Sequence, residues 1–570
     1  MRKIITLKSF SFLYLLLIFT TKVIAGDTLS ISPRLYHIDH NKNIIIISQS
    51  TNAINIRNTN TQSHISLDHT YQFDQPVRQI STDSSYKVSL ADSVYTLYFT
   101  QLPIIHINTS KAIEDSPDVY AQFTMVEESG LITQSNIGVQ IRGAYSQTFP
   151  KKSYELSFWN DTVGAVDRDV RLLNMREDNK WNLQAMYNEP LRINSKVANE
   201  LWLDIHEVYY KALEPTAKNG ISMAYVELFV NDNYRGIYAL SERVDRKQLK
   251  LKKYNNGIKG ELYKGVDWGG AVTFTDLPPF ENTSSNWGGF EYKHPEEEVN
   301  WTNLYNFVDF VKNSSNQNFY SAYKQKFDIN NAVDYYILLN FLRAGDNYGK
   351  NIYIAKYKTG DPYFYVPWDL DGVFGIDWQG NKIVVTNGIL SNGFYDRLIN
   401  DCSPGGFRSK LIQRWTELRA SIITEDNILA KIQANQEYLS HNRVYEREEI
   451  AWNTYSVDTN HLPYLTTWLR DRLSYLDGVF SQQCAPLSAP TAKQEVELKL
   501  YPNPTSDYLT IESDALPYEL SILDMRGKTV LKSNLKGAIN KVDLRLIAKG
   551  MYVVTVKNSK AVQTKKLLIN

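Results

Sequence analysis

The sequence lacks several features that would restrict its function at once. Its 570 residues carry a formal net charge of zero and only two cysteines, and no basic run follows the N-terminal segment. This balance excludes the positive footprint of a nucleic-acid-binding protein and that of a protein attached to an anionic membrane surface. Two thiols do not make a metal site by themselves. We therefore expect no nucleic-acid partner.

Long hydrophobic runs are also missing, except at the N-terminus. The chain begins MRKIITLKSFSFLYLLLIFTTKVIAG, with basic residues, an apolar stretch from Phe10 to Phe19 and then TTK. The apolar stretch is shorter than the ~20 residues that span a bilayer. The pattern predicts a secretory signal peptide over residues 1–25, cleaved after Ala25. No transmembrane segment is expected after its removal.

The two cysteines, Cys402 and Cys484, both lie in the part of the chain that would be exported. A disulfide is chemically permitted there. Two alternatives stay open, a disulfide that ties together the ends of a helical segment and two buried free thiols. The sequence does not decide between them, because it does not show whether the Cβ atoms meet.

Length and a hydrophobic content of 43% predict three or four domains. Residues 26–100 alternate apolar and polar positions, as in VYTLYFT, and predict a β-rich accessory domain. Strand patterns continue to about residue 270, with one helix predicted over residues 191–205. From about residue 300 helices dominate, beginning with a helix that Asp328 caps. We therefore expect an α+β fold with a β-rich lobe followed by a helical lobe.

The C-terminal part reads as a separate domain. Residues 485–497 are rich in proline, alanine and charge and predict a linker. Residues 498–570 contain about seven short strand patterns at regular intervals. This spacing predicts a small β-sandwich.

The stretch RAGDNYGKNIYIAKYKTGDPYFYVPWDLDGVFG, residues 343–375, carries the clearest catalytic pattern. Asp346 precedes Asn351 by five residues. The runs IYIAKY and YFYVPW flank the turn KTGD and predict a β-hairpin that brings Asp369 beside this pair. In protein kinases an Asp takes the proton of the acceptor hydroxyl, while an Asn and a second Asp hold Mg²⁺. The alternative is a polar turn in which Asp371 caps the next segment.

A phosphotransferase also needs a cation for the nucleotide phosphates. The segment FPKKSYELSF offers Lys151 and Lys152. Strand alternation places Lys152 on the same face as Tyr154 and Leu156, so we expect Lys152 to point into the cleft. The alternative is that both lysines are solvated strand positions.

The neighbouring segments offer further candidates. The hairpin before the lysines contains Gly138 and Gly143 but no GxGxxG loop. Arg142 is placed either to contact phosphate or to form a surface ion pair. Glu242 follows a strand at the expected connection between lobes, where it either lines the adenine end of the site or pairs with a nearby arginine.

Four blocks, taken together, resemble a known family. They are VQIRGAYSQTFPKKSYEL, LNMREDNKWNLQAMYNEPLRINSKVANELW, YVELFVNDNYRGIYALSERVDRKQL and FYVPWDLDGVFG. In this order they resemble the CotH kinase family, atypical protein kinases first known from spore coats, over about residues 102–480. The resemblance implies a kinase-like bilobal domain over residues 101–484 and phosphorylation of protein side chains with ATP and Mg²⁺ or Mn²⁺.

The resemblance also implies roles for single residues. Asp346 matches the catalytic aspartate, Asp369 the metal-binding aspartate, Asn351 the second metal ligand and Lys152 the phosphate lysine.

Other residues match the family text without a fixed role, namely Arg142, Glu242 and Asp371. In protein kinases the phosphate-binding lysine pairs with a glutamate on a helix of the first lobe. By this comparison Glu200, on the single predicted helix of the first lobe, is the candidate partner of Lys152.

The C-terminal domain resembles a second family. Its opening YPNPTSDYLTI and its ending, GMYVVTV followed by KKLLIN, are similar to the type A sorting domain of type IX secretion. This resemblance implies a Bacteroidota-type bacterium, handling by the type IX machinery, and a product that is secreted or held at the cell surface after residues from about 498 are removed.

Three functions stay open at this point. The first is an exported atypical protein kinase that acts on an unidentified protein substrate. The second is a kinase-fold surface protein that binds or adheres without turnover, because ATP is scarce outside the cell and a fold does not settle function. The third is a metal-dependent phosphohydrolase that uses the same aspartates. The presence of Asp346, Asn351, Asp369 and Lys152 favours an enzyme, since a pure binder needs none of them.

Overall fold

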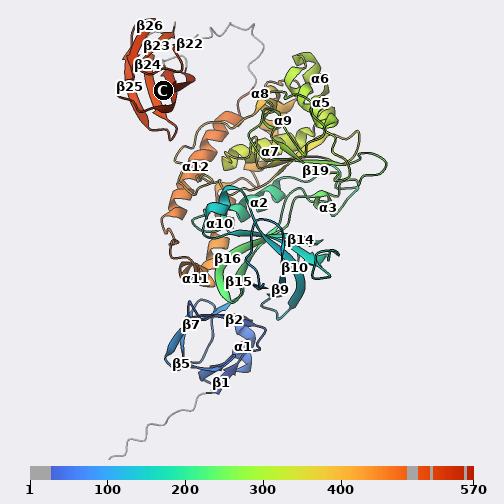
Figure 1. The fold of residues 1–570 in the computed structure, drawn as a ribbon, viewed down its shortest axis with the longest axis vertical. Coiled ribbons are helices and arrows are strands. Elements are labelled where there is room, and N and C mark those ends of the chain that lie inside the picture. Colours follow the sequence, from blue (N-terminus) through green and yellow to red (C-terminus); the bar gives the residue numbers. More distant parts are fainter. Residues whose placement is uncertain (1–26, 484–497, 514–517, 558–561) are drawn as a thin grey trace, which may run out of the picture. The chain divides into compact units, whose positions relative to one another are not determined.

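The computed structural model describes residues 27–483, 498–513, 518–557 and 562–570. The signal peptide and the linker expected from the sequence lie outside these residues. The architecture is mixed α/β, and the chain divides into two compact units, Met1–Cys484 and Ala485–Asn570 (Figure 1). No helix in the described ranges has both the length and the apolar character needed to cross a membrane.

The first unit begins with a seven-stranded sheet in the order β1-β4-β5-β6-β7-β3-β2. Its elements are β1 (Asp27–Ser30), β2 (Tyr36–Asp39), β3 (Ile44–Ser48), α1 (Thr51–Arg57), β4 (Gln62–Ser66), β5 (Thr70–Val77), β6 (Ser85–Leu90) and β7 (Ser93–Thr100). Every residue of β3 is buried. Ile45 and Ile47 face the core of this sheet, whereas Ile44 and Ile46 pack with Phe229 of the next region. The isoleucine run is continuous because both faces of the strand are covered.

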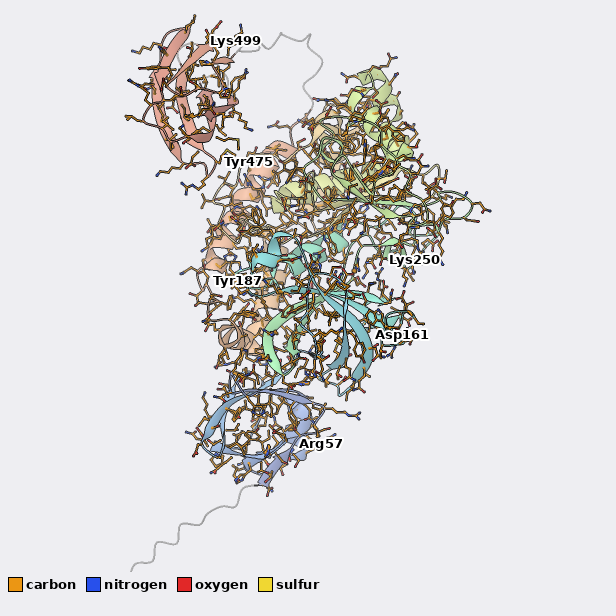
Figure 2. The ribbon with its side chains drawn as sticks, viewed as in Figure 1. Arg57, Asp161, Tyr187, Lys250, Tyr475 and Lys499 are labelled. Atoms are coloured by element: carbon orange, nitrogen blue, oxygen red, sulfur yellow. The ribbon has the colours of Figure 1, made fainter. Side chains whose placement is uncertain are left out.

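The next region is a closed β-barrel in the order β10-β11-β14-β16-β15-β8-β9 (Figure 1). Its strands are β8 (Ile104–Asn108), β9 (Val119–Val126), β10 (Ile132–Arg142), β11 (Ser153–Trp159), β14 (Lys180–Gln184), β15 (Met223–Val230) and β16 (Asn233–Ser241). Apolar side chains from alternate positions fill its interior. Figure 2 draws the side chains on the same ribbon. The shorter elements are η1 (Tyr145–Thr148), β12 (Val170–Arg171), β13 (Glu177–Asp178) and α3 (Arg246–Leu249).

One helix of three turns accompanies the barrel, as the sequence predicts. It is α2 (Asn194–Ile205), and it buries Val197, Leu201 and Ile205. The predicted four-residue apolar repeat therefore marks its packed face.

The region after the barrel is not purely helical, which corrects the prediction of a helical lobe. It contains a five-stranded sheet in the order β18-β19-β17-β20-β21. The strands are β17 (Glu261–Gly265), β18 (Asn286–Trp287), β19 (Phe290–His294), β20 (Ile352–Lys356) and β21 (Tyr363–Pro367). The helices are α4 (Gly270–Thr273), α5 (Thr302–Asn313), α6 (Asn316–Lys326), α7 (Ile329–Leu342), α8 (Gly393–Leu398), α9 (Phe407–Arg419), α10 (Glu425–His441), α11 (Val444–Ala451) and α12 (His461–Phe480).

Helix α7 is the central element of this region. Its N-cap is Asp328, as predicted, whose carboxylate accepts a hydrogen bond from the Asn330 amide at 3.0 Å. Nearly all of its residues are buried, as in a helix enclosed by protein on every side. Asn331 joins α7 to β21, because its Nδ2 donates to the Tyr365 carbonyl at 2.9 Å and its Oδ1 accepts from the Tyr365 amide at 2.6 Å. The helix ends at Leu342, and its C-cap Arg343 directly precedes the predicted catalytic loop.

Cys402 is disulfide-bonded, in agreement with the first of the two alternatives above. The chain has one other cysteine, Cys484, which lies outside the described residues.

The second unit has two sheets over one apolar core. One contains β22 (Leu498–Tyr501), β23 (Tyr508–Ser513) and β26 (Ile539–Asp543), and the other contains β24 (Tyr518–Asp524), β25 (Thr529–Leu535), β27 (Gly550–Lys557) and β28 (Val562–Ile569). Leu509, Leu520, Val554 and Leu567 are buried in this core. The seven strands in the described part of this unit agree with the predicted β-sandwich.

Candidate functional site

A cavity of about 710 Å³ lies where the outer face of the barrel meets the five-stranded sheet. Strands β10, β11 and β14 line one side, and β17 and the loops after α7 and β21 line the other. The structure brings together five of the residues that the sequence singled out, which are Arg142, Asp346, Asn351, Asp369 and Asp371. Three predicted residues, Lys152, Glu200 and Glu242, do not line the cavity.

The predicted hairpin explains why Asn351 and Asp369 meet. Strands β20 and β21 pair antiparallel, with Ile352 opposite Pro367. Asn351 therefore stands directly before the first strand, and Trp368 directly after the second. The Trp368 amide donates to the Asn351 carbonyl at 3.2 Å. The predicted hairpin is confirmed.

A buried asparagine fixes this end of the hairpin. The Nδ2 of Asn347 donates to the Asn351 carbonyl at 2.9 Å and to the Trp368 carbonyl at 2.6 Å. Asn351 and Asp369 both have left-handed backbones, with φ of 52° and 55°. Asn and Asp tolerate this conformation better than most residues, although each instance still costs on the order of 1 kcal/mol.

Asp346 is oriented by its neighbour. The Nδ2 of Asn351 donates to Oδ2 of Asp346 at 3.0 Å, which directs Oδ1 of Asn351 away from the carboxylate. Burial raises the pKa of Asp346, Lys350 opposes this shift, and Asp369 adds to it. The hydrogen bond from Asn351 thus orients the Asp346 carboxylate, and burial increases its affinity for a proton.

Asp371 lies against the same cluster. The Nδ2 of Asn188 donates to its Oδ2 at 2.8 Å. Burial raises the pKa of Asp371 well above its ordinary value, and the charge of Asp369 raises it further. Crowded carboxylates with raised pKa values favour a bound cation, because a divalent ion relieves their mutual repulsion.

Glu189 is a further carboxyl group of the cavity that the sequence reasoning missed. Ser195 donates to its Oε1 from both the hydroxyl and the backbone amide, while its buried Oε2 has no hydrogen-bond partner among the described residues. Burial raises the pKa of Glu189 to about 7. Arg192 holds the loop, because its Nη1 donates to the carbonyls of Met186, Tyr187 and Glu189 at 2.6–2.7 Å. The signal in the sequence that could have indicated this residue is the single acidic position in the segment YNEPLR.

The prediction that Lys152 points into the cavity is wrong. Its Nζ instead donates to the carbonyls of Gln147 and Phe149, at 2.5 and 2.6 Å. Lys151 lines the cavity in its place. The Lys151 side chain is fully buried, and its Nζ donates to Glu448 Oε1 at 2.5 Å and to the Ile237 carbonyl at 2.6 Å.

The error has a simple physical reason. The apolar face of β11, with Tyr154 and Leu156, belongs to the interior of the barrel. The opposite face, with Ser153 and Glu155, lines the cavity together with Lys151. The strand alternates as expected, but the cleft lies outside the barrel and not beside the apolar face.

Glu448 on α11 organises a buried ion network behind the cavity. It accepts from Lys151, from Arg192 Nε at 3.1 Å and from the Ile237 amide at 3.0 Å. Burial lowers the pKa of Lys151 to about 8, Glu448 opposes this shift, and Arg192 adds to it. Gly236, with φ of 85°, permits the approach, because a Cβ atom there would collide with the Glu448 carboxylate.

Two glutamates predicted to belong to the site serve elsewhere. Glu200 forms an ion pair with Lys196, one turn earlier on α2. Glu200 is therefore the partner of neither Lys151 nor Lys152, and the carboxylate that pairs with Lys151 is Glu448.

Glu242 is buried and satisfied by other groups. It accepts from Lys218 Nζ at 2.5 Å and from the backbone amides of Ser222 and Arg176 at 2.8 and 3.0 Å. These bonds hold Glu242 outside the lining of the cavity, and the ion pair that its carboxylate forms among the described residues is with Lys218 and not with a nearby arginine.

Additional cations line the cavity on the barrel side and on β17. Arg142 lies over the Trp368 ring at 5.4 Å, and Arg243 Nη1 pairs with Glu155 at 2.5 Å. Lys264 of β17 was missed by the sequence reasoning. Burial lowers the pKa of Lys264, Arg142 adds to this shift, and Asp369 opposes it. Cationic side chains thus lie beside the carboxylate cluster. This arrangement suits an anion with a bound divalent metal, because the cations can bind the anion and the carboxylates can bind the metal.

The fold and the cavity define a class of protein: a mixed α/β protein in which carboxylates and cationic side chains line the same cavity. A family model described as CotH kinase protein matches residues 139–476, more than half of the chain. The chain therefore belongs to the CotH kinase family, as the sequence blocks indicate. A second model, described as secretion system C-terminal sorting domain, matches residues 499–570.

A search of characterised proteins gives a distant relative. Inner spore coat protein H of Bacillus subtilis (strain 168) is 22% identical over 304 residues, which cover 53% of this chain and 76% of that protein.

Proposed function

We propose that this protein is an exported kinase that transfers the γ-phosphate of ATP to hydroxyl groups of protein side chains. The observation that carries the proposal is the convergence of Asp346, Asn351, Asp369 and Lys151 on one cavity. In this proposal the barrel region and the sheet-and-helix region act as the two lobes of a kinase-like fold. Family membership supports the reaction class.

The donor set at the cavity fits Mg²⁺ or Mn²⁺. Asp369, Asp371 and the Oδ1 of Asn351 offer the hard oxygen ligands that these ions prefer. Burial, and to a smaller extent the charge of Asp369, raise the pKa of Asp371, and a bound cation would stabilise both carboxylates in their ionised form. A bound ion would neutralise charge on the β- and γ-phosphates of the nucleotide.

The remaining residues have roles that follow from their positions. Asp346, held by Asn351, accepts the proton of the acceptor hydroxyl, and its raised pKa suits a general base. Lys151, Lys264 and Arg142 bind the phosphates from the barrel side and from β17. Glu448 keeps Lys151 charged and in place.

The sorting domain supports secretion or display at the cell surface. We propose that the type IX machinery exports the chain and that residues from about 498 are removed afterwards. The kinase would then act on proteins outside the cytoplasm.

The test is an assay with [γ-³²P]ATP, Mg²⁺ or Mn²⁺ and a generic protein acceptor. We expect label on protein, and we expect Asp369→Asn to abolish it. Asp346→Asn should retain nucleotide binding and lose transfer, because a base acts mainly in the transition state. Asp361→Asn is the matched control, because Asp361 lies at the other end of the same hairpin and its carboxylate accepts a hydrogen bond from the Tyr209 hydroxyl at 3.3 Å. Release of free phosphate without labelled protein would indicate a phosphohydrolase instead. Absence of nucleotide binding would favour a binding or adhesion protein.

A further inference from the structure

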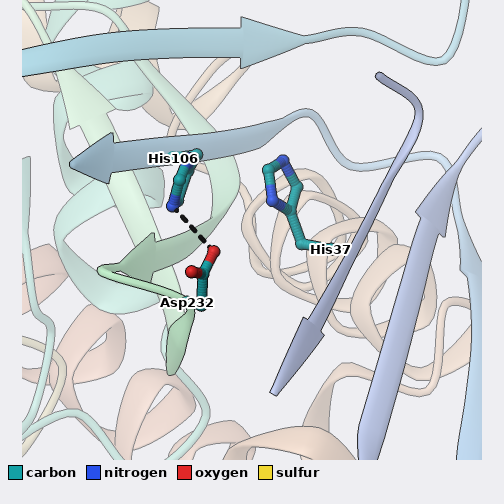
Figure 3. A group of neighbouring side chains, drawn as sticks. All are labelled: His37, His106 and Asp232. Carbon is teal, nitrogen blue, oxygen red and sulfur yellow. Dashed lines mark ion pairs between the residues drawn. The ribbon is translucent and has the colours of Figure 1, made fainter. Parts of the chain in front are cut away.

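Three side chains of the types that bind metals lie close together where the N-terminal sheet contacts the barrel, away from the cavity. His37 lies on β2, His106 on β8 and Asp232 in the turn between β15 and β16. Figure 3 shows the three side chains pointing toward a common centre. None of them has a part in the proposed phosphoryl transfer.

The geometry of the three groups is compact. One ligand atom from each residue lies within 4.8 Å of the other two. His106 Nε2 is 3.2 Å from Asp232 Oδ1, and the two imidazole rings are 4.8 Å apart between centroids. Small side-chain rotations would bring these atoms to the ~2.0–2.2 Å metal–ligand distances typical of Zn²⁺.

His106 also has an unmet requirement. Its Nε2 is buried and has no hydrogen-bond partner among the described residues, although the Asp232 carboxylate faces it. A buried polar atom without a partner is costly and calls for an explanation. A cation between the imidazole and the carboxylate would supply one.

The backbone around the three residues holds them in position. Asn231 and Asp232 have φ of 50° and 61°, as in the tight type I′ turn that joins two antiparallel strands. The next strand is tied to β2, because the Tyr234 amide donates to Asp39 Oδ2 at 2.9 Å. The His37 ring also contacts Phe229, with centroids 5.1 Å apart. The site is thus built across two regions that already touch.

We propose that His37, His106 and Asp232 bind one divalent transition-metal ion of the zinc type, which clamps the N-terminal sheet to the barrel. Two imidazole nitrogens and one carboxylate form a ligand set that suits Zn²⁺, with a fourth position for water. The Asp232 side chain is 74% exposed, so the ion has a path from solvent.

Titration of the metal-free chain, purified without a polyhistidine tag, with ZnCl₂ tests this proposal. We expect one Zn²⁺ per chain, a higher thermal midpoint with zinc, and tetrahedral cobalt absorption when Co²⁺ replaces zinc. Asp232→Asn should weaken zinc binding by at least tenfold, and His106→Gln should abolish it. Asp232 is exposed and asparagine suits this turn, so the Asp232→Asn variant should fold.

The control is His69→Gln, in the turn between β4 and β5 of the N-terminal sheet. His69 Nδ1 pairs with Asp68 at 3.1 Å on the surface, but no third ligand is grouped with them among the described residues. This variant should bind zinc as the parent does. The proposal is overturned if the parent binds zinc no more tightly than Asp232→Asn does, or if His69→Gln weakens binding as much as Asp232→Asn.

Discussion

Replacing each of two adjacent lysines gives a sharp test of the site, because only one of them faces the cavity. Lys151→Met removes two buried hydrogen bonds, to Glu448 at 2.5 Å and to the Ile237 carbonyl at 2.6 Å. Loss of one partner from a buried ion pair costs about 3–5 kcal/mol. Glu448 keeps Arg192 and the Ile237 amide as donors, so we expect a loss near the lower limit. Lys152→Met removes two bonds from a half-buried amine and should cost about 1 kcal/mol.

The two variants should differ more in activity than in stability. Because methionine cannot bind phosphate, Lys151→Met should lower kcat/KM for ATP by about a hundredfold, equivalent to ~2.7 kcal/mol of transition-state stabilisation. Lys152→Met should stay within about threefold of the parent, since the Lys152 amine bonds only to backbone carbonyls. The assay is transfer of label from ATP, with thermal unfolding measured in parallel.

A double variant separates the role of Lys151 in folding from its role in activity. Lys151→Met with Glu448→Gln removes opposite charges together, and Arg192 keeps three carbonyl acceptors. We expect recovery of much of the lost stability without recovery of transfer. Recovered transfer in the double variant, or an equal loss of transfer in Lys152→Met, would refute the assignment of Lys151 to the phosphates.

The same cavity supports three more predictions. Asp369→Asn should raise the thermal midpoint without metal, because it removes the charge that repels Asp371; a lowered midpoint would argue against a metal-binding cluster. The kcat/KM for ATP should fall as the pH rises above about 8, where Lys151 loses its proton; a flat profile in that range would count against Lys151. Gly236→Ala should displace Glu448 and lower both stability and transfer, measured by thermal unfolding and label incorporation, whereas an unchanged variant would show that the close approach is dispensable.

Parts of the site that depend on short-range pattern could be predicted from the sequence. The hairpin between Asn351 and Asp369 follows from two apolar runs around one turn, and the Asp328 cap follows from the polar residue before an apolar helix. Each of these features is settled by residues that are neighbours in the chain.

Other parts depend on long-range packing and could not be predicted. Lys151 and Glu448 are separated by 297 positions, and no local pattern joins them. The choice between Lys151 and Lys152 required knowing that the apolar face of β11 fills a closed barrel. His37, His106 and Asp232 come from three separate elements and form no sequence motif.

The most direct test of the proposed kinase site is a crystal structure of the chain with a non-hydrolysable ATP analogue and Mn²⁺, with the anomalous signal of manganese recorded. The proposal predicts a manganese peak bound by Asp369 and Asn351, with Lys151 on the phosphates and Asp346 facing the γ-phosphate. A nucleotide bound outside this cavity, or a metal that does not contact Asp369, would contradict it.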